Sequence, residues 1–176
     1  MFFIPGFVIA IITFPGVIVH EFAHQLFCRL LRVPVFKVCY FRVGNPAGYV
    51  IHEAPKENWK SLLIGIGPFF VNTIVGFLIA LPASIPVVKF HQSNPADFLL
   101  IYLGVSIAMH AFPSTGDAKT IWSSFEKKGN WLARFLVAPI IGLIYLGAVG
   151  SFIWLDLIYG VGVTIGLPEV VIKMLA

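Results

Sequence analysis

Long apolar runs alternate with short polar connections along the chain. Four of these runs can cross a bilayer as helices, for which about 20 predominantly apolar residues are typical. The predicted spans are residues 2–31, 59–81, 98–112 and 131–159. A fifth apolar stretch, residues 161–176, contains glycines, a proline and two charged residues. We expect this stretch to lie at the membrane interface rather than to cross it.

The connection between the first two runs has a different pattern. Residues 35–43 mix β-branched and aromatic residues with two basic ones, residues 44–48 read Gly-Asn-Pro-Ala-Gly, and Tyr49-Val50-Ile51 follows. Such runs on both sides of a Gly- and Pro-rich turn are typical of a β-hairpin. We predict a hairpin over residues 35–53, and an irregular interfacial loop is the alternative.

The composition narrows the class of protein. Of 176 residues, 59% are hydrophobic and 11% are charged, whereas soluble domains carry about 25% charged residues. This excludes a water-soluble globule and a disordered chain. We predict an all-α polytopic membrane protein with about four transmembrane helices and a short membrane-associated β-hairpin. At this length we expect one domain, residues 1–176, with no second soluble domain.

The basic residues predict the orientation. Ten of the twelve Lys and Arg residues lie in or next to two connections, the one between spans one and two and the one between spans three and four. Cytoplasmic loops are enriched in Lys and Arg. We therefore expect both basic loops in the cytoplasm and both termini outside. Because topology explains the net charge of +4, we expect no nucleic-acid partner.

The first span contains the sequence His20-Glu21-Phe22-Ala23-His24. On a helix, histidines at i and i+4 share one face and can bind one zinc ion, and the Glu between them can act as general base on zinc-activated water. Each ionisable residue inside a membrane costs about 2.5–3.5 kcal/mol, which a bound cation would offset. A hydrogen-bonded polar cluster, such as a proton path, is the alternative. Pro15-Gly16, one turn upstream, predicts a kink.

Catalytic zinc sites use three protein ligands, so a third must come from the cytoplasmic side, where His20 and His24 are expected. The glutamates there alternate with or adjoin lysines and are typical of solvated charges: Glu53, Glu57 and Glu126. His52, His110 and Asp117 remain. Asp117 follows a break with Pro and Gly, which membrane proteins tolerate only inside protein or beside water. This position favours Asp117 as a ligand, and a charge that merely stabilises a helix N-terminus is the alternative.

Two further polar residues are candidates for contact with substrate or an oxyanion. Asn72 shares a helix face with Gly65 and Gly76, which favours helix packing and leaves a substrate or oxyanion contact as the second interpretation. His110 is compatible with metal ligation, oxyanion donation or an ordinary polar helix contact.

These residues resemble the three-helix core of the site-2 proteases, which are intramembrane zinc metalloproteases. The resemblance covers about residues 10–125 and rests on His20-Glu21-x-x-His24, on Gly67-Pro68-x-x-x-Asn72 and on the Pro-containing turn that leads to Asp117. The chain departs from the family pattern in three places. Asn72 stands one residue later than usual, His110 replaces the Asn of Asn-x-x-Pro, and Asp117 is not followed by Gly.

The resemblance implies one Zn²⁺ ion per chain bound by His20, His24 and Asp117, with Glu21 as the catalytic base. It implies cleavage of peptide bonds within or near transmembrane segments of other proteins. From the distribution of basic residues we expect the active site to open toward the cytoplasm. The resemblance indicates a divergent small member without a PDZ or CBS domain, whose hairpin pairs with an unwound substrate.

The expected partners are a transmembrane protein substrate and the lipid bilayer, and a homo-oligomer or a regulatory membrane partner remains open. Three alternatives also remain. They are a catalytically silent metal-binding scaffold, a transporter, and a membrane zincin that uses Glu as its third ligand.

Overall fold

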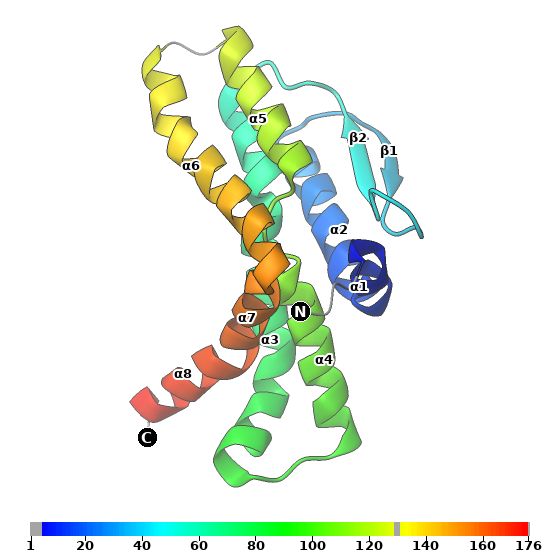
Figure 1. Cartoon of the computed structure of the whole chain (residues 1–176), viewed down its shortest axis with the longest axis vertical. Helices are drawn as coiled ribbons and strands as arrows, with labels where there is room; N and C mark the ends of the chain where they lie inside the picture. The colour runs from blue at the N-terminus through cyan, green and yellow to red at the C-terminus, as the bar shows by residue number, and fades with distance from the viewer. Residues whose placement is uncertain (1–4, 129–130, 176) are drawn as a thin grey trace.

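One long helix, α3 (Asn58–Phe90), runs the length of the molecule and organises the other elements around it (Figure 1). The computed structural model describes residues 5–128 and 131–175, which are mostly helical with one two-stranded sheet. The remaining elements are α1 (Gly6–Ile12), α2 (Phe14–Leu30), β1 (Val35–Cys39), β2 (Tyr49–His52), α4 (Pro95–Met109), α5 (Thr115–Lys128), α6 (Trp131–Gly150), η1 (Ser151–Ile153), α7 (Leu155–Val161), η2 (Gly162–Gly166) and α8 (Leu167–Leu175).

Three helices that contact one another, α2, α3 and α4, form the centre of the fold. The start of α4 follows from its sequence, because the Asn94 side chain accepts hydrogen bonds from the backbone N–H groups of Ala96 and Asp97, and the Asp97 carboxylate accepts from the Asn94 N–H. This reciprocal capping defines a helix N-terminus. At the other end α4 stops at Met109, and after a short break the chain continues in roughly the same direction as α5, which begins beside α2 (Figure 1).

The first apolar run is broken rather than continuous. Helices α1 and α2 meet at an angle of 90°, with Thr13 between them. Pro15 lies in the first turn of α2, where its missing N–H costs no hydrogen bond. The disturbance predicted near Pro15-Gly16 is therefore a break just upstream of Pro15 and not a kink within one helix. Residues 2–4 of the predicted span lie outside the described residues.

Two helical segments of the described chain are long and apolar enough to cross a membrane, Asn58–Val87 and Trp131–Ile153. A third crossing results if α1 and α2 form one broken span. The other boundaries differ from prediction, because α3 continues past residue 81, α4 ends before residue 112, and the last span is interrupted at Trp154, whose φ is 62°. The chain thus has the helices of a membrane protein, and the count of four spans stays a prediction.

The predicted hairpin is confirmed as an antiparallel pair. β1 pairs with β2 in a register that joins Val38 to Val50 and Cys39 to Tyr49, with an irregularity between Val35 and Lys37. Both strands contact α2, and the hydroxyl of Tyr40 donates to the Gln25 side chain of α2 at 2.5 Å. The hairpin therefore lies against the helix that carries the His-Glu-x-x-His sequence (Figure 1).

Helices α5 and α6 pack through an apolar interface. The buried members recur every three to four residues on each helix, as expected for one face of a helix: Ala118, Ile121, Phe125, Val137, Ile141 and Ile144. The opposite side of α6 exposes further large apolar side chains, among them Phe135, Leu143 and Leu146. A helix that is apolar on all sides is typical of a membrane environment.

Candidate metal centre

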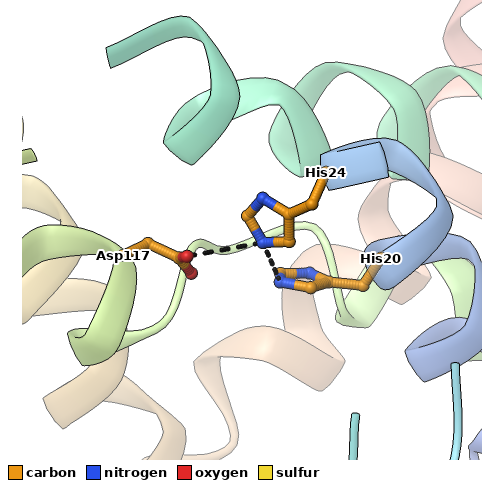
Figure 2. A group of neighbouring side chains, drawn as sticks. All are labelled: His20, His24 and Asp117. Carbon is orange, nitrogen blue, oxygen red and sulfur yellow. Dashed lines mark hydrogen bonds and ion pairs between the residues drawn. The ribbon is translucent and has the colours of Figure 1, made fainter. Parts of the chain in front are cut away.

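Helix α2 presents His20 and His24 on one face, one turn apart. Their Nε2 atoms lie 3.2 Å from each other, and both rings point toward the start of α5 (Figure 2). His24 is buried, with 7% of its surface exposed. The helical spacing of the two residues therefore brings two imidazole nitrogens to one point, as the sequence predicts.

The third member of the cluster is Asp117, in the first turn of α5. Its Oδ1 lies 3.4 Å from His24 Nε2, and a dashed line marks this pair in Figure 2. Its Oδ2 accepts hydrogen bonds from the Ser114 N–H at 2.7 Å and from the Ser114 hydroxyl at 2.6 Å. Ser114 thus fixes one carboxylate oxygen and leaves the other directed at the histidines.

Each histidine is oriented by a backbone carbonyl behind it. His20 Nδ1 donates to the carbonyl oxygen of His110 at 2.7 Å, and His24 Nδ1 donates to that of Ile64 at 2.9 Å. Because a carbonyl can only accept, both Nδ1 atoms carry the hydrogen and both Nε2 atoms have a free lone pair. Such outer contacts are those that set the tautomer of metal-binding histidines.

The geometry of the cluster fits a zinc ion. Ligand atoms of a tetrahedral zinc site, each about 2.0–2.1 Å from the metal, are about 3.3–3.4 Å apart. The pairs at 3.2 Å and 3.4 Å match this spacing, and one ligand atom from each of the three residues lies within 4.8 Å of the others. Two imidazoles and one carboxylate are also a donor set that catalytic zinc sites use.

Glu21 lies in the same cavity as the three candidate ligands. The cavity has a volume of about 520 Å³ and is bounded by α2, the hairpin and the start of α5. Glu21 is 8% exposed, and its side chain lies against Gly48, where an added Cβ would come within 2.6 Å of Glu21 Cγ and 2.9 Å of Oε1. Only glycine leaves room for this carboxylate beneath the hairpin turn.

His110 and His52 also line this cavity but have other partners. The His110 ring bonds through Nε2 to the Thr13 hydroxyl at 2.8 Å, and Thr13 donates its own hydrogen to the Ile9 carbonyl. Nε2 of His110 is therefore the donor. His52 Nδ1 donates to the carbonyl of Glu53 at 2.8 Å. Among the described residues, the group placed to hold a metal consists of His20, His24 and Asp117.

Asn72 occupies a different place from the metal cluster. It is fully buried between three helices, and its Nδ2 donates to the carbonyl oxygens of Gly16 at 3.2 Å and Ile107 at 3.0 Å. Both amide hydrogens are thus used to join α2 and α4 to α3. This arrangement fits the packing interpretation, and an oxyanion contact by Asn72 stays an untested prediction.

The glutamates of the two basic connections behave as surface charges where the structure defines their contacts. Glu57 pairs with Lys60 at 3.1 Å, and this hydrogen bond lowers the pKa of Glu57 below its usual value. Glu53 lines a separate small hollow that also includes Glu57 and Lys60. No glutamate belongs to the metal-binding group formed by the described residues.

Three contributors to this site are not among the residues predicted from the sequence, namely Ser114, Gly48 and the carbonyl of Ile64. Ser114 could have been found, because Ser-x-x-Asp before a helix is a typical capping signal. Gly48 and Ile64 could not have been found from the sequence, because their contacts with α2 join segments that are distant in the chain. Their importance follows only from how the hairpin and α3 pack against α2.

Comparison with known proteins agrees with this geometry. The sequence model of the DUF3267 family, described as "putative zincin peptidase", matches residues 13–130. This range contains the candidate zinc ligands and Glu21. No curated protein and no solved structure matches the chain. Because the matched region covers more than half of the chain, the protein belongs to this family of zincin peptidases.

Proposed function

We propose that this zincin peptidase is an intramembrane protease of the site-2 protease type, which cleaves peptide bonds within or near transmembrane segments of other proteins. The observation that carries the proposal is the convergence of His20, His24 and Asp117 between helices of a membrane protein. A partly buried cluster of three ionisable groups is stabilised by a bound cation, because ionisable groups at membrane depth are otherwise costly.

The residues divide the chemistry between them. His20, His24 and Asp117 would hold one zinc ion per chain, which when bound polarises the scissile carbonyl and makes water more acidic. Glu21 accepts a proton from the attacking water while the water oxygen forms a bond to the carbonyl carbon. Glu21 then delivers that proton to the amine as the C–N bond breaks. Ser114 and the carbonyls of Ile64 and His110 keep the ligands aligned.

The hairpin supports a substrate bound as an extended strand. Tyr49, Val50 and His52 of β2 line the metal cavity, so a segment paired with this strand would pass close to Glu21. A helical substrate hides its peptide bonds in its own hydrogen bonds, and strand addition replaces those bonds with new ones. The proposed partners are therefore a transmembrane protein substrate and the bilayer that delivers it.

Water and polar groups can approach the site beside α5. A second hollow of about 350 Å³ is lined by hydroxyl residues of α5 and by part of the hairpin, and it shares with the metal cavity the residues Val50, His52, Ser61 and Thr120. The basic loops flank this region. With these loops in the cytoplasm, the active site opens to the cytoplasm and both termini lie outside.

The decisive experiment compares the wild type with Glu21→Gln in proteoliposomes that contain a single-span substrate. We expect Glu21→Gln to keep its zinc and to lose cleavage by about 10²–10⁴-fold, the usual contribution of a general base. Glu57→Gln, a change of the same chemistry at the surface, is the control and should cleave normally.

Two outcomes would contradict the proposal. Unchanged cleavage by Glu21→Gln would remove this residue from the mechanism. Zinc-loaded wild type that cuts no membrane substrate and no soluble peptide would favour the metal-binding scaffold, and zinc flux across the vesicle would favour a transporter.

A further inference from the structure

The carbonyl that orients His24 comes from inside a helix. Carbonyl oxygens within an α-helix normally accept from the N–H four residues later, so Ile64 O would accept from residue 68. Residue 68 is a proline within α3, and proline has no N–H. The carbonyl of Ile64 is therefore left without its helical donor and is available to the Nδ1–H of His24, which it accepts at 2.9 Å.

Proline also affects where this carbonyl points. The ring of a proline inside a helix clashes with the carbonyl four residues earlier and pushes it away from the helix axis. Ile64 and Pro68 are both buried, Ile64 at 3% exposure, and Ile64 lines the metal cavity. The displaced carbonyl thus lies on the side of α3 that faces α2, within hydrogen-bond distance of His24 Nδ1.

The other histidine uses a carbonyl of similar origin. His110 is the residue that follows the last turn of α4, where carbonyls lack helical donors. The N–H four residues later belongs to Ser114 and donates to Asp117 instead. Both candidate zinc-binding histidines therefore donate to carbonyls that lack their usual helical donor. For His20 this is the carbonyl at the end of α4, and for His24 it is the carbonyl four residues before Pro68.

We infer that Pro68 is a positioning residue for the zinc site, acting through the Ile64 carbonyl to fix the tautomer and ring orientation of His24. The inference rests on the zinc site of the proposed function but not on the substrate or on cleavage within the membrane. It gives the Gly67-Pro68 sequence a chemical role in addition to its effect on the shape of α3.

The test compares the effect of replacing Pro68 with the effect of replacing Pro82. Pro82 is another proline inside α3 and lies more than three helical turns further along the helix. Pro68→Ala returns an N–H that competes with His24 for the Ile64 carbonyl. Pro82→Ala makes the same chemical change away from the metal. Zinc affinity is measured by chelator competition in detergent, and cobalt-substituted protein reports ligand geometry through its visible absorption.

We expect Pro68→Ala to weaken zinc binding by about 10–100-fold, the range for loss of an outer contact to a metal ligand, and to alter the cobalt spectrum. Pro82→Ala should bind both metals like the wild type. The thermal stability of the metal-free Pro68→Ala protein should not fall, because a helical hydrogen bond is regained. A purely structural role for Pro68 predicts the reverse combination, lower stability and normal zinc affinity.

A second variant, Pro68→Val, returns the N–H and keeps the same number of side-chain carbons as proline. It covers the case in which alanine leaves a cavity that prevents folding. Zinc affinity equal to the wild type in either folded Pro68 variant would overturn the inference. So would equal losses in the Pro68 and Pro82 variants. A wild type that binds zinc but cleaves no membrane substrate would contradict the proposed function and leave this result intact.

Discussion

Helices α2 and α5 each supply part of one metal cluster, but the structure holds them in different ways. Hydrogen bonds anchor α2, since Asn72 donates to the Gly16 carbonyl and the Gly16 N–H donates to the Ser106 hydroxyl. Apolar contacts hold α5, whose buried side chains Ala118, Ile121 and Phe125 pack against α6.

The difference follows from what surrounds each helix. If the bent α1–α2 pair spans the membrane, the surrounding lipid is as apolar as a leucine side chain. Hydrophobic burial then does little to fix the rotation of α2, whereas hydrogen bonds between helices do. α5 has a polar face that lines a hollow beside the hairpin, so its apolar face gains by leaving water. The two halves of the site should therefore respond differently to the same kind of substitution.

The largest effect is expected from Asp117→Ala. Removing a ligand should weaken zinc binding by more than about 100-fold, beyond the range for outer contacts, while α5 stays helical because its apolar face is intact. Zinc content by mass spectrometry and circular dichroism measure the two effects. Glu126→Ala on the same helix is the control. Retention of zinc by the Asp117→Ala protein would exclude Asp117 as a ligand.

Gly48→Ala should come next. The added Cβ would meet the Glu21 side chain at 2.6–3.0 Å, so the carboxylate or the turn must move. A displacement of about 1 Å can cost about 100-fold in rate, and we expect this loss in peptidase activity with normal zinc content. Gly44→Ala, whose Cβ would have only Arg42 Nε nearby at 3.9 Å, should cleave normally, and equal losses in both variants would refute the specific contact.

Ile121→Ala tests the apolar anchor of α5. Ile121 is fully buried, and the cavity should cost about 2–3 kcal/mol of the free energy of unfolding, measured by reversible unfolding in bicelles. Zinc affinity should fall as well, because α5 carries Asp117. Leu146→Ala, at a side chain 63% exposed, should change stability little, and a larger effect there would mean that α6 has a protein partner on its outer face.

Asn72→Ala tests the hydrogen-bonded anchor of α2 and should have the smallest effect. Hydrogen bonds between helices in membranes contribute about 0.6 kcal/mol on average and about 1.7 kcal/mol at most, so we expect about 1 kcal/mol in the same unfolding assay. A loss greater than that of Ile121→Ala would reverse the comparison and make hydrogen bonding the stronger of the two anchors.

Local pattern alone was sufficient for part of the site. His20, Glu21 and His24 were found because four-residue spacing places side chains on one helix face whatever the rest of the fold does. The hairpin was found because turn residues separate two β-type runs. The break at Thr13 was placed only approximately, since Pro15 is equally compatible with a kink and with the start of a new helix.

The sequence by itself determined the membrane class, the two imidazoles and the carboxylate between them, because apolar content and helical periodicity act locally. The break before Asp117 already favoured this residue as the third ligand, and the tertiary structure places it, rather than His52 or His110, next to the two histidines. Only the tertiary structure decided that Gly48 covers Glu21 and that Ile64 orients His24. These contacts join residues up to 97 positions apart along the chain. They depend on how α3, α5 and the hairpin pack against α2, which no local pattern specifies.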